Sequence, residues 1–300
     1  MTSRVDGRHG SGDASWDASA GQGSGARRWP YPDVLLDEAA FEFSDWDRVG
    51  SYDGMVYSPK GDQDGWDALR FGAWYYEEGM SYDPVRDHDL RIGCFQMAEL
   101  LYLHAAEFGN PIAHLNLGYV YSYDRCEGRY WNTNAVVDGP VSLDALCAAL
   151  AGEGPTAHVQ AGPDPDAGGT AEWDRKAFEH YRTAALAGVA EAWYKLGDLL
   201  RDGRGCDVDL RKAFGAFTSA YTFGKDQSPV IWGSAALRLG TAFEEGEGCD
   251  QSFAEACIWY ERAVTGLGIA VRGGDSWYRG ALRRAEQGLK RVKQELSGQY

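Results

Sequence analysis

A short pattern that returns four times is the feature of this sequence that most constrains its fold. Each copy has a large apolar residue, then glycine, then an aromatic or aliphatic residue three positions after the glycine. In a helix, the first and last of these residues lie on the same face. The pattern predicts the first helix of a helix pair at Phe71-Gly72…Tyr75, Leu117-Gly118…Tyr121, Leu196-Gly197…Leu200 and Leu239-Gly240…Phe243.

A second pattern follows each of these copies and predicts the second helix of the pair. It has alanine, an aromatic residue four positions later and alanine three positions after that. The small residues would let neighbouring helices approach closely, and the rings would fill the space between them. The sets are Ala98, Tyr102 and Ala105; Ala177, Tyr181 and Ala184; Ala213, Phe217 and Ala220; and Ala256, Tyr260 and Ala263.

The distance between the two patterns is constant where the repeats are regular. It is 17 residues from Leu196 to Ala213 and again from Leu239 to Ala256. With the connecting turns the ideal unit is about 36 residues, slightly longer than the roughly 34 of a tetratricopeptide unit. A helix pair of this kind buries only one side, so successive pairs must stack. We therefore expect an all-α solenoid.

The repeats suggest the domain organisation. Residues 1–30 are rich in Gly and Ser and have little to bury, which predicts a disordered tail. The solenoid is expected over residues 31–300, with a Gly- and Pro-rich insertion at about 124–172. Apolar residues spaced three or four apart among basic ones predict a cap helix at about 276–297.

Composition narrows the range of partners and compartments. The net charge is −16, which argues against a nucleic-acid backbone or an anionic membrane as a direct partner. No apolar run approaches 18 residues and none opens the chain, so we expect a cytoplasmic protein. The six cysteines lack the paired spacing of a disulfide or zinc framework, and free thiols are expected.

The two patterns together resemble the Sel-1-like repeat family, a relative of the tetratricopeptide proteins. Two copies carry the resemblance best, because a Gly-x-Gly turn also follows the first helix in both, at Gly203 and Gly205 and at Gly246 and Gly248. The resemblance implies a right-handed superhelix whose first helices line a concave face. It also implies a non-catalytic scaffold or adaptor for a protein or peptide. Some bacterial members, mostly cysteine-rich ones, are associated with β-lactam binding or hydrolysis.

Motifs that would indicate catalysis, a metal or a cofactor are weak or missing. Asp62, Asp64 and Asp67 lack the spacing of an EF-hand loop and are expected to form a solvated acidic loop. His104, His114 and His180 lie on predicted helices without a liganding residue four positions on. Phosphate-binding, dinucleotide-binding and hydrolase motifs do not occur. We therefore predict no catalytic residue, no metal and no cofactor.

The resemblance also identifies candidate binding residues. In tetratricopeptide proteins, the residues at certain fixed positions of each first helix face the ligand in the groove. Transferred to this chain, the positions are aromatic and mostly acidic, which favours a partner with basic or apolar character. An ordinary solvated face is the competing interpretation. The predicted partner-binding residues are Trp66, Tyr76, Glu77, Tyr119, Tyr123, Glu191, Tyr194, Asp198, Arg201, Glu244 and Glu245.

Three other functions remain open at this stage. The first is an acidic inhibitor or effector that occupies the basic nucleic-acid-binding site of a target protein. The second is a β-lactam-binding hydrolase, which the sequence disfavours because no nucleophile stands beside a base. The third is self-association through the acidic N-terminal region and the basic C-terminal helix.

Overall fold

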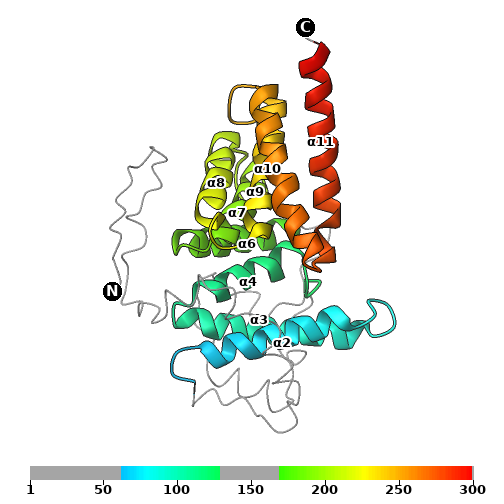
Figure 1. Ribbon diagram of the computed structural model, residues 1–300. Coiled ribbons are helices and arrows are strands. Elements are labelled where there is room, and N and C mark those ends of the chain that lie inside the picture. The colour runs from blue at the N-terminus through cyan, green and yellow to red at the C-terminus, as the bar shows by residue number, and fades with distance from the viewer. Residues whose placement is uncertain (1–61, 129–168, 299–300) are drawn as a thin grey trace, which may run out of the picture.

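The computed structural model describes residues 62–128 and 169–298, and these residues form helices joined by short turns (Figure 1). The tail predicted at 1–30 and most of the insertion predicted at 124–172 lie outside the described residues. The elements are α2 (Trp66–Ser81), α3 (His88–Glu107), α4 (Pro111–Ser122), α6 (Gly169–Leu186), α7 (Ala190–Asp202), α8 (Leu210–Gly224), α9 (Pro229–Glu245), α10 (Phe253–Arg272), the 3₁₀ turn η5 (Ser276–Tyr278) and α11 (Arg279–Gly298).

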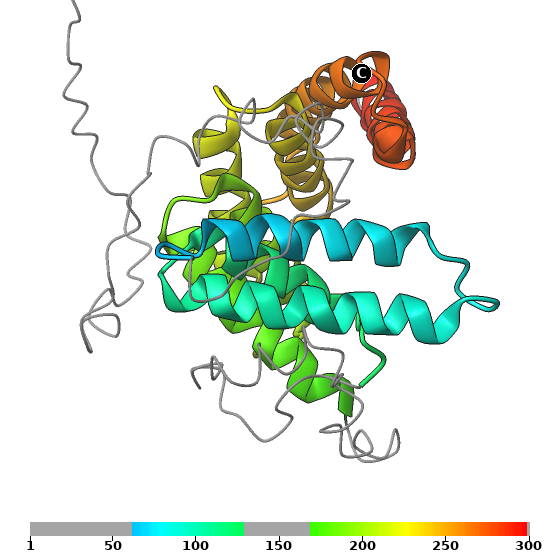
Figure 2. The same cartoon turned by 90° about the horizontal axis from the view of Figure 1, so that it is seen from below.

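The helices stack as consecutive pairs. Within the described residues, α2 packs on α3, α4 on α6, α7 on α8 and α9 on α10, and each pair also contacts the next along the chain. Figure 1 shows the pairs rising from α2 and α3 to α10 and α11, and Figure 2 shows α2 and α3 side by side. The helical solenoid predicted from the sequence is confirmed.

Each first helix meets its second helix through the repeat glycine and the repeat aromatic ring. A Cβ atom placed on Gly118 or Gly197 would lie 2.4 Å from the ring of Tyr181 or Phe217. At the corresponding contacts in the first and last pairs, Gly72 against Tyr102 and Gly240 against Tyr260, the distance would be 2.8 Å. Only glycine leaves room for the ring, so the two sequence patterns describe the two sides of one contact.

The Gly-x-Gly turns join the two helices of a repeat, α7 to α8 and α9 to α10, and contact the repeat before. Gly205 and Gly248 have φ values of 70° and 75°, in the left-handed region that glycine adopts without strain. A Cβ atom on either would lie 2.1 Å from a backbone carbonyl oxygen, that of Asp174 or that of Leu210. These carbonyls lie near the start of the second helix of the preceding repeat, so the turn packs directly against its neighbour.

The start of α2 corrects one expectation from the sequence. Asp62 is buried, at 7% exposure, and does not form part of a solvated loop. Its carboxylate accepts hydrogen bonds from the backbone N–H groups of Gly65 and Ala68, at 2.9 and 2.8 Å. Because first-turn N–H groups have no partner inside the helix, the carboxylate supplies one and caps the start of α2.

The C-terminal end of the stack is formed by α11, which packs against α10 and α9. Ala285 and Val292 are buried against a small core that includes Tyr260. A larger core extends from α2 to α9. The cysteines within the described ranges are free thiols, and none of the helices there is long and apolar enough to cross a bilayer.

Candidate functional site

The first helices surround an open cavity of about 900 Å³. Residues of α2, α4, α7 and α9 line it, together with Tyr102 of α3, η5 and the first turns of α11. The lining is rich in aromatic rings from successive repeats. These are Tyr76, Tyr102, Tyr119, Tyr123, Tyr194, Trp277 and Tyr278.

The repeat register explains why these rings face the cavity. In each first helix, the repeat leucine and glycine turn toward the second helix. Positions a few residues to either side therefore turn to the opposite face. Tyr119 stands two residues after Leu117, and Tyr194 stands two residues before Leu196. The same face of each repeat thus supplies the wall of one shared cavity.

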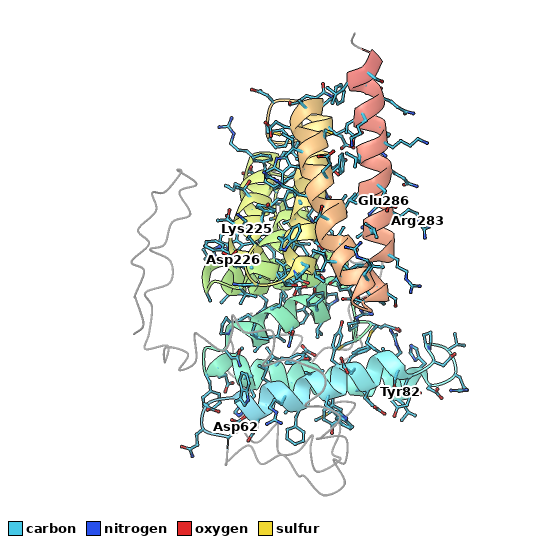
Figure 3. The ribbon with its side chains drawn as sticks, viewed as in Figure 1. Asp62, Tyr82, Lys225, Asp226, Arg283 and Glu286 are labelled. Atoms are coloured by element: carbon cyan, nitrogen blue, oxygen red, sulfur yellow. The ribbon has the colours of Figure 1, made fainter. Side chains whose placement is uncertain are left out.

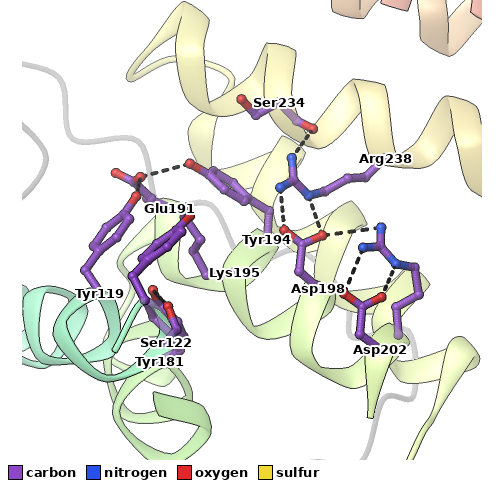
Figure 4. A network of polar contacts seen from close by, with 12 residues as sticks. Tyr119, Ser122, Tyr181, Glu191, Tyr194, Lys195, Asp198, Asp202, Ser234 and Arg238 are labelled. Carbon is purple, nitrogen blue, oxygen red and sulfur yellow. Dashed lines mark hydrogen bonds and ion pairs between the residues drawn. The ribbon is translucent and has the colours of Figure 1, made fainter. Parts of the chain in front are cut away.

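Glu191 does not line the cavity but joins two repeats through Tyr119 and Tyr194, which together are called the tyrosine wall below (Figure 4). Its Oε1 accepts a hydrogen bond from the Tyr194 hydroxyl at 2.8 Å and another from the Tyr119 hydroxyl. Burial, followed by the charge of Glu191, raises the pKa of both phenols well above its usual value. The two tyrosines therefore remain neutral donors at physiological pH and hold the Glu191 carboxylate in place.

A second bridge joins α7 to α9 (Figure 4). The Arg238 Nε donates to Asp198 Oδ1 at 2.7 Å, a second guanidinium N–H donates to Oδ2, and Nη1 donates to the Ser234 carbonyl at 3.0 Å. The guanidinium carbon lies 4.5 Å from the centre of the Tyr194 ring. Burial would lower the pKa of Arg238, but the Asp198 charge and hydrogen bonds outweigh it and raise the pKa. Asp198 is thus neutralised inside the chain.

Other cations face the cavity in aromatic surroundings. The Arg125 guanidinium lies 5.1 Å and the Lys195 ammonium 5.6 Å from the centre of the Tyr123 ring, so the two flank one ring. Arg125 donates to the Tyr76 hydroxyl at 2.9 Å, and Lys195 lies 4.4 Å from the centre of the Tyr119 ring. Such cation–π contacts orient the cations without cancelling their charge.

Most residues predicted for the groove do meet in this region. Tyr76, Glu77, Tyr119, Tyr123 and Tyr194 line the cavity itself. Asp198 and Arg201 line an adjoining cavity of about 420 Å³. Glu191 does not line the cavity, but it accepts hydrogen bonds from the lining residues Tyr119 and Tyr194.

The remaining predicted residues lie elsewhere. Trp66 packs against the main hydrophobic core from the first turn of α2. Glu244 is bound by two groups, the Tyr260 hydroxyl at 2.5 Å and the Arg291 guanidinium at 2.8 Å. Glu245 is exposed at the end of α9 and lines neither cavity.

The charge of the lining differs from the acidic one expected from the sequence. Glu191, Asp198 and Glu244 each receive hydrogen bonds from tyrosine or arginine side chains of the same protein. Four cations that were not predicted line the cavity, namely Arg125, Lys195, Arg238 and Arg284. The groove positions taken from the tetratricopeptide proteins identified these carboxylates. They could not show the partners, several of which, such as Tyr119, Arg238 and Arg291, come from other helices.

A sequence signal for part of this set does exist. Asn116, Lys195 and Arg238 each stand immediately before a repeat leucine, and all three line the cavity. The position before the leucine is therefore a groove position in this chain. Arg125, Trp277 and Arg284 lie outside the regular repeat register, and no periodic pattern could have placed them.

One polar pair outside the cavity was also missed. The Nδ1 atoms of His114 on α4 and His180 on α6 lie 2.8 Å apart, so one ring donates a hydrogen bond and the other accepts it. Burial, then the charges of His114 and Lys176, lowers the pKa of His180 well below its usual value. Within residues 62–128 and 169–298, no three His, Cys, Asp or Glu side chains are placed to hold a metal ion.

A family model agrees with part of the repeat register. The Sel1 repeat family model matches residues 174–189, 190–215 and 233–265. The crystal structure of a Sel1 repeat protein from Oxalobacter formigenes is similar over 85% of this chain and 84% of that one, with 17% identity and a TM-score of 0.46. A protective antigen of uropathogenic Escherichia coli with an SLR fold is similar over 83% of this chain and 55% of that one, with 19% identity and a TM-score of 0.29. The chain thus spans little more than half of the second protein. No curated protein sequence matches the chain.

Proposed function

We propose that this chain, a Sel1 repeat protein, is a non-catalytic scaffold that holds a peptide segment of another protein in the cavity lined by its first helices. Sel1 repeat proteins generally act as modules for protein–protein interaction. The single observation that carries the proposal for this chain is the open cavity of about 900 Å³ lined by aromatic rings from successive repeats.

The dimensions and lining support a peptide as the occupant. Binding pockets for small molecules span roughly 300–1,000 Å³ and enclose most of the ligand. This cavity has a similar volume, but it is open and extends from α2 to α11, which suits an extended segment better than a compact molecule. Tyrosine and tryptophan rings supply contact area at low entropic cost because each has only two side-chain torsions.

Two rings at the rim are the strongest candidates for direct contact. Tyr123 is 52% exposed and Trp277 is 77% exposed, although both are large and apolar. Tyr119 and Tyr194, by contrast, use their hydroxyls to hold Glu191, and Tyr194 is almost fully buried. The rim rings are therefore free to gain buried area when a partner binds.

The chemistry of the lining supports binding rather than catalysis. Catalytic nucleophiles need a lowered pKa or an adjacent base. Burial instead raises the pKa of the Tyr76, Tyr119 and Tyr194 hydroxyls. The histidines and cysteines of the described residues lie outside this lining.

A peptide-display selection on the immobilised full chain tests the proposal. Enriched peptides should bind the wild type saturably and lose about tenfold or more in affinity to a Tyr123→Ala, Trp277→Ala variant, because hot-spot aromatics each contribute about 2 kcal/mol. A Phe223→Ala, Ile258→Ala variant is the matched control, since it removes exposed apolar side chains from the second helices α8 and α10. Failure to enrich any peptide, or equal binding by both variants, would refute the proposal.

A further inference from the structure

We infer that the segment bound in this cavity is acidic, with Asp or Glu side chains that contact Arg125, Lys195 and Arg284 while apolar side chains pack on the tyrosine wall. The inference rests on the proposed function and names the chemistry of the partner. It reverses the basic partner that the groove positions alone suggested. Three observations carry it: the geometry of the cations, the engagement of the carboxylates and the exposure of the rim.

Two of the cations lie beside one ring of the lining, and a third lines the same cavity from another helix. Arg125 and Lys195 flank the exposed ring of Tyr123 from two elements, the turn after α4 and helix α7. Arg284 reaches the same cavity from α11 and also lines the adjoining one. An anionic side chain beside Tyr123 would therefore meet donors from two elements, Arg125 and Lys195, and charge-assisted hydrogen bonds could form with both.

The partners of these cations leave their charge available. Arg125 and Lys195 contact tyrosine hydroxyls and rings, at 2.9 Å for Nε to the Tyr76 hydroxyl and 3.4 Å for Nζ to the Tyr123 hydroxyl. Among the described residues, no carboxylate lies within ion-pair distance of Arg125, Lys195 or Arg284. Arg238 is different, because Asp198 already neutralises it.

The carboxylates near the cavity are less able to attract a basic partner. Glu191 already accepts two phenolic hydrogen bonds behind the wall, and Asp198 is held by Arg238. Of the acidic side chains that the structure describes, Glu77 alone is part of the lining itself. Burial raises its pKa, which shows an environment that disfavours its charged form. A basic peptide would meet three cations and a single available carboxylate.

The net charge of −16 decides between classes of anionic ligand. Surface charges farther away than about 8 Å are largely screened at physiological salt, so the local cations dominate for a short acidic segment. A nucleic acid carries a phosphate at every nucleotide and would extend beyond the cavity over an acidic protein surface. The observations thus favour a peptide with a few carboxylates that alternate with apolar residues.

Three labelled peptides of one length test the inference on the full chain by fluorescence anisotropy. In the first, Glu alternates with Phe and Leu; in the others Gln or Lys replaces every Glu. The Glu peptide should bind most tightly, and its affinity should fall when ionic strength rises from about 0.01 to about 0.15 M. Arg284→Gln and Lys195→Gln should each weaken it roughly two- to fivefold, the effect of one exposed ion pair.

Arg283→Gln is the matched control. Arg283 adjoins Arg284 and is exposed, but it lies on the outer side of α11 and does not line the cavity (Figure 3). This variant should bind the Glu peptide with unchanged affinity. Equal losses from Arg283→Gln and Arg284→Gln would overturn the inference, because the effect would then reflect the overall charge of α11.

The outcomes separate the inference from the function on which it rests. Tighter binding of the Lys or Gln peptide, lost in the Tyr123→Ala, Trp277→Ala variant, would keep the scaffold and overturn its preference for acidic segments. Binding of none of the three peptides, with no peptide enriched by display, would remove both. A single-stranded DNA of similar length that binds more tightly than the Glu peptide would also overturn the inference.

Discussion

Single residues set the spacing between the helices of each pair. The repeat glycine touches the aromatic ring of the partner helix in all four described pairs, as with Gly197 against Phe217. A glycine inside a helix costs about 0.5–1 kcal/mol relative to alanine because the unfolded chain gains freedom. The solenoid tolerates this cost four times, because close packing of the helices depends on it.

Two glycine substitutions in neighbouring helices should have opposite effects. Gly197→Ala should destabilise the protein by about 1–3 kcal/mol, because the new methyl group would overlap the Phe217 ring. Gly215→Ala on α8 should stabilise it by about 0.5–1 kcal/mol, because, apart from its chain neighbours and the backbone of its own helix, no atom of the described residues lies within 4 Å of the new Cβ. Urea unfolding measures both. Stabilisation by Gly197→Ala would contradict the assigned contact.

At the scale of elements, the interface between α4 and α6 contains a buried titratable pair. His180 is 3% exposed and its ring stacks on Tyr121, with centres 5.5 Å apart. Its other charged or titratable neighbours are His114 and Lys176, and both charges oppose protonation of His180. The interface therefore holds His180 in its neutral form.

The stability of this interface should depend on pH. The pKa of His180 is depressed in the folded protein, so below its usual value of 6.5 the unfolded chain binds the proton first. The free energy of unfolding should fall as the pH drops from about 7 to about 5.5, by up to about 1.4 kcal/mol per pH unit.

Unfolding of the wild type and His180→Gln across this range isolates the contribution. The variant should lose less stability on acidification. His88 has a raised pKa because Glu127 and Asp89 bind it, so it contributes with the opposite sign, but equally in both proteins. Identical slopes for the two proteins would show that His180 is protonated freely in the folded state.

The sequence could predict the helix pairs because each helix repeats a local pattern. Leu196, Gly197 and Ala213 are close in the chain and meet the same requirement in every repeat. The His114–His180 contact joins residues 66 positions apart, and the Asp198–Arg238 bridge joins residues 40 positions apart. Such contacts depend on how far each pair rotates against the next, and a local pattern does not contain that information.

For the whole molecule, the stack brings the same face of successive first helices around one cavity, which η5 and the start of α11 also line. Figure 1 shows α11 at the end of the stack. Tyr76, Tyr119, Tyr123 and Tyr194 of this cavity were predictable because they follow the repeat register, whereas Tyr102 and Tyr278 were not predicted to line it. The charge of the cavity was not predictable, because Arg125 and Arg284 lie outside the register and three of the predicted carboxylates, Glu191, Asp198 and Glu244, are bound within the chain. The function proposed here depends on that assembled surface rather than on any one motif.

Photo-crosslinking with the Glu-containing peptide tests the central claim most directly, because it locates the ligand on the molecule. One Phe of the peptide would carry a benzophenone, and mass spectrometry would map the attached sites. We predict attachment to α4, α7 and the segment from η5 to the start of α11, close to Tyr123, Lys195 and Trp277. Attachment to the outward faces of α3, α8 or α10 would contradict the account.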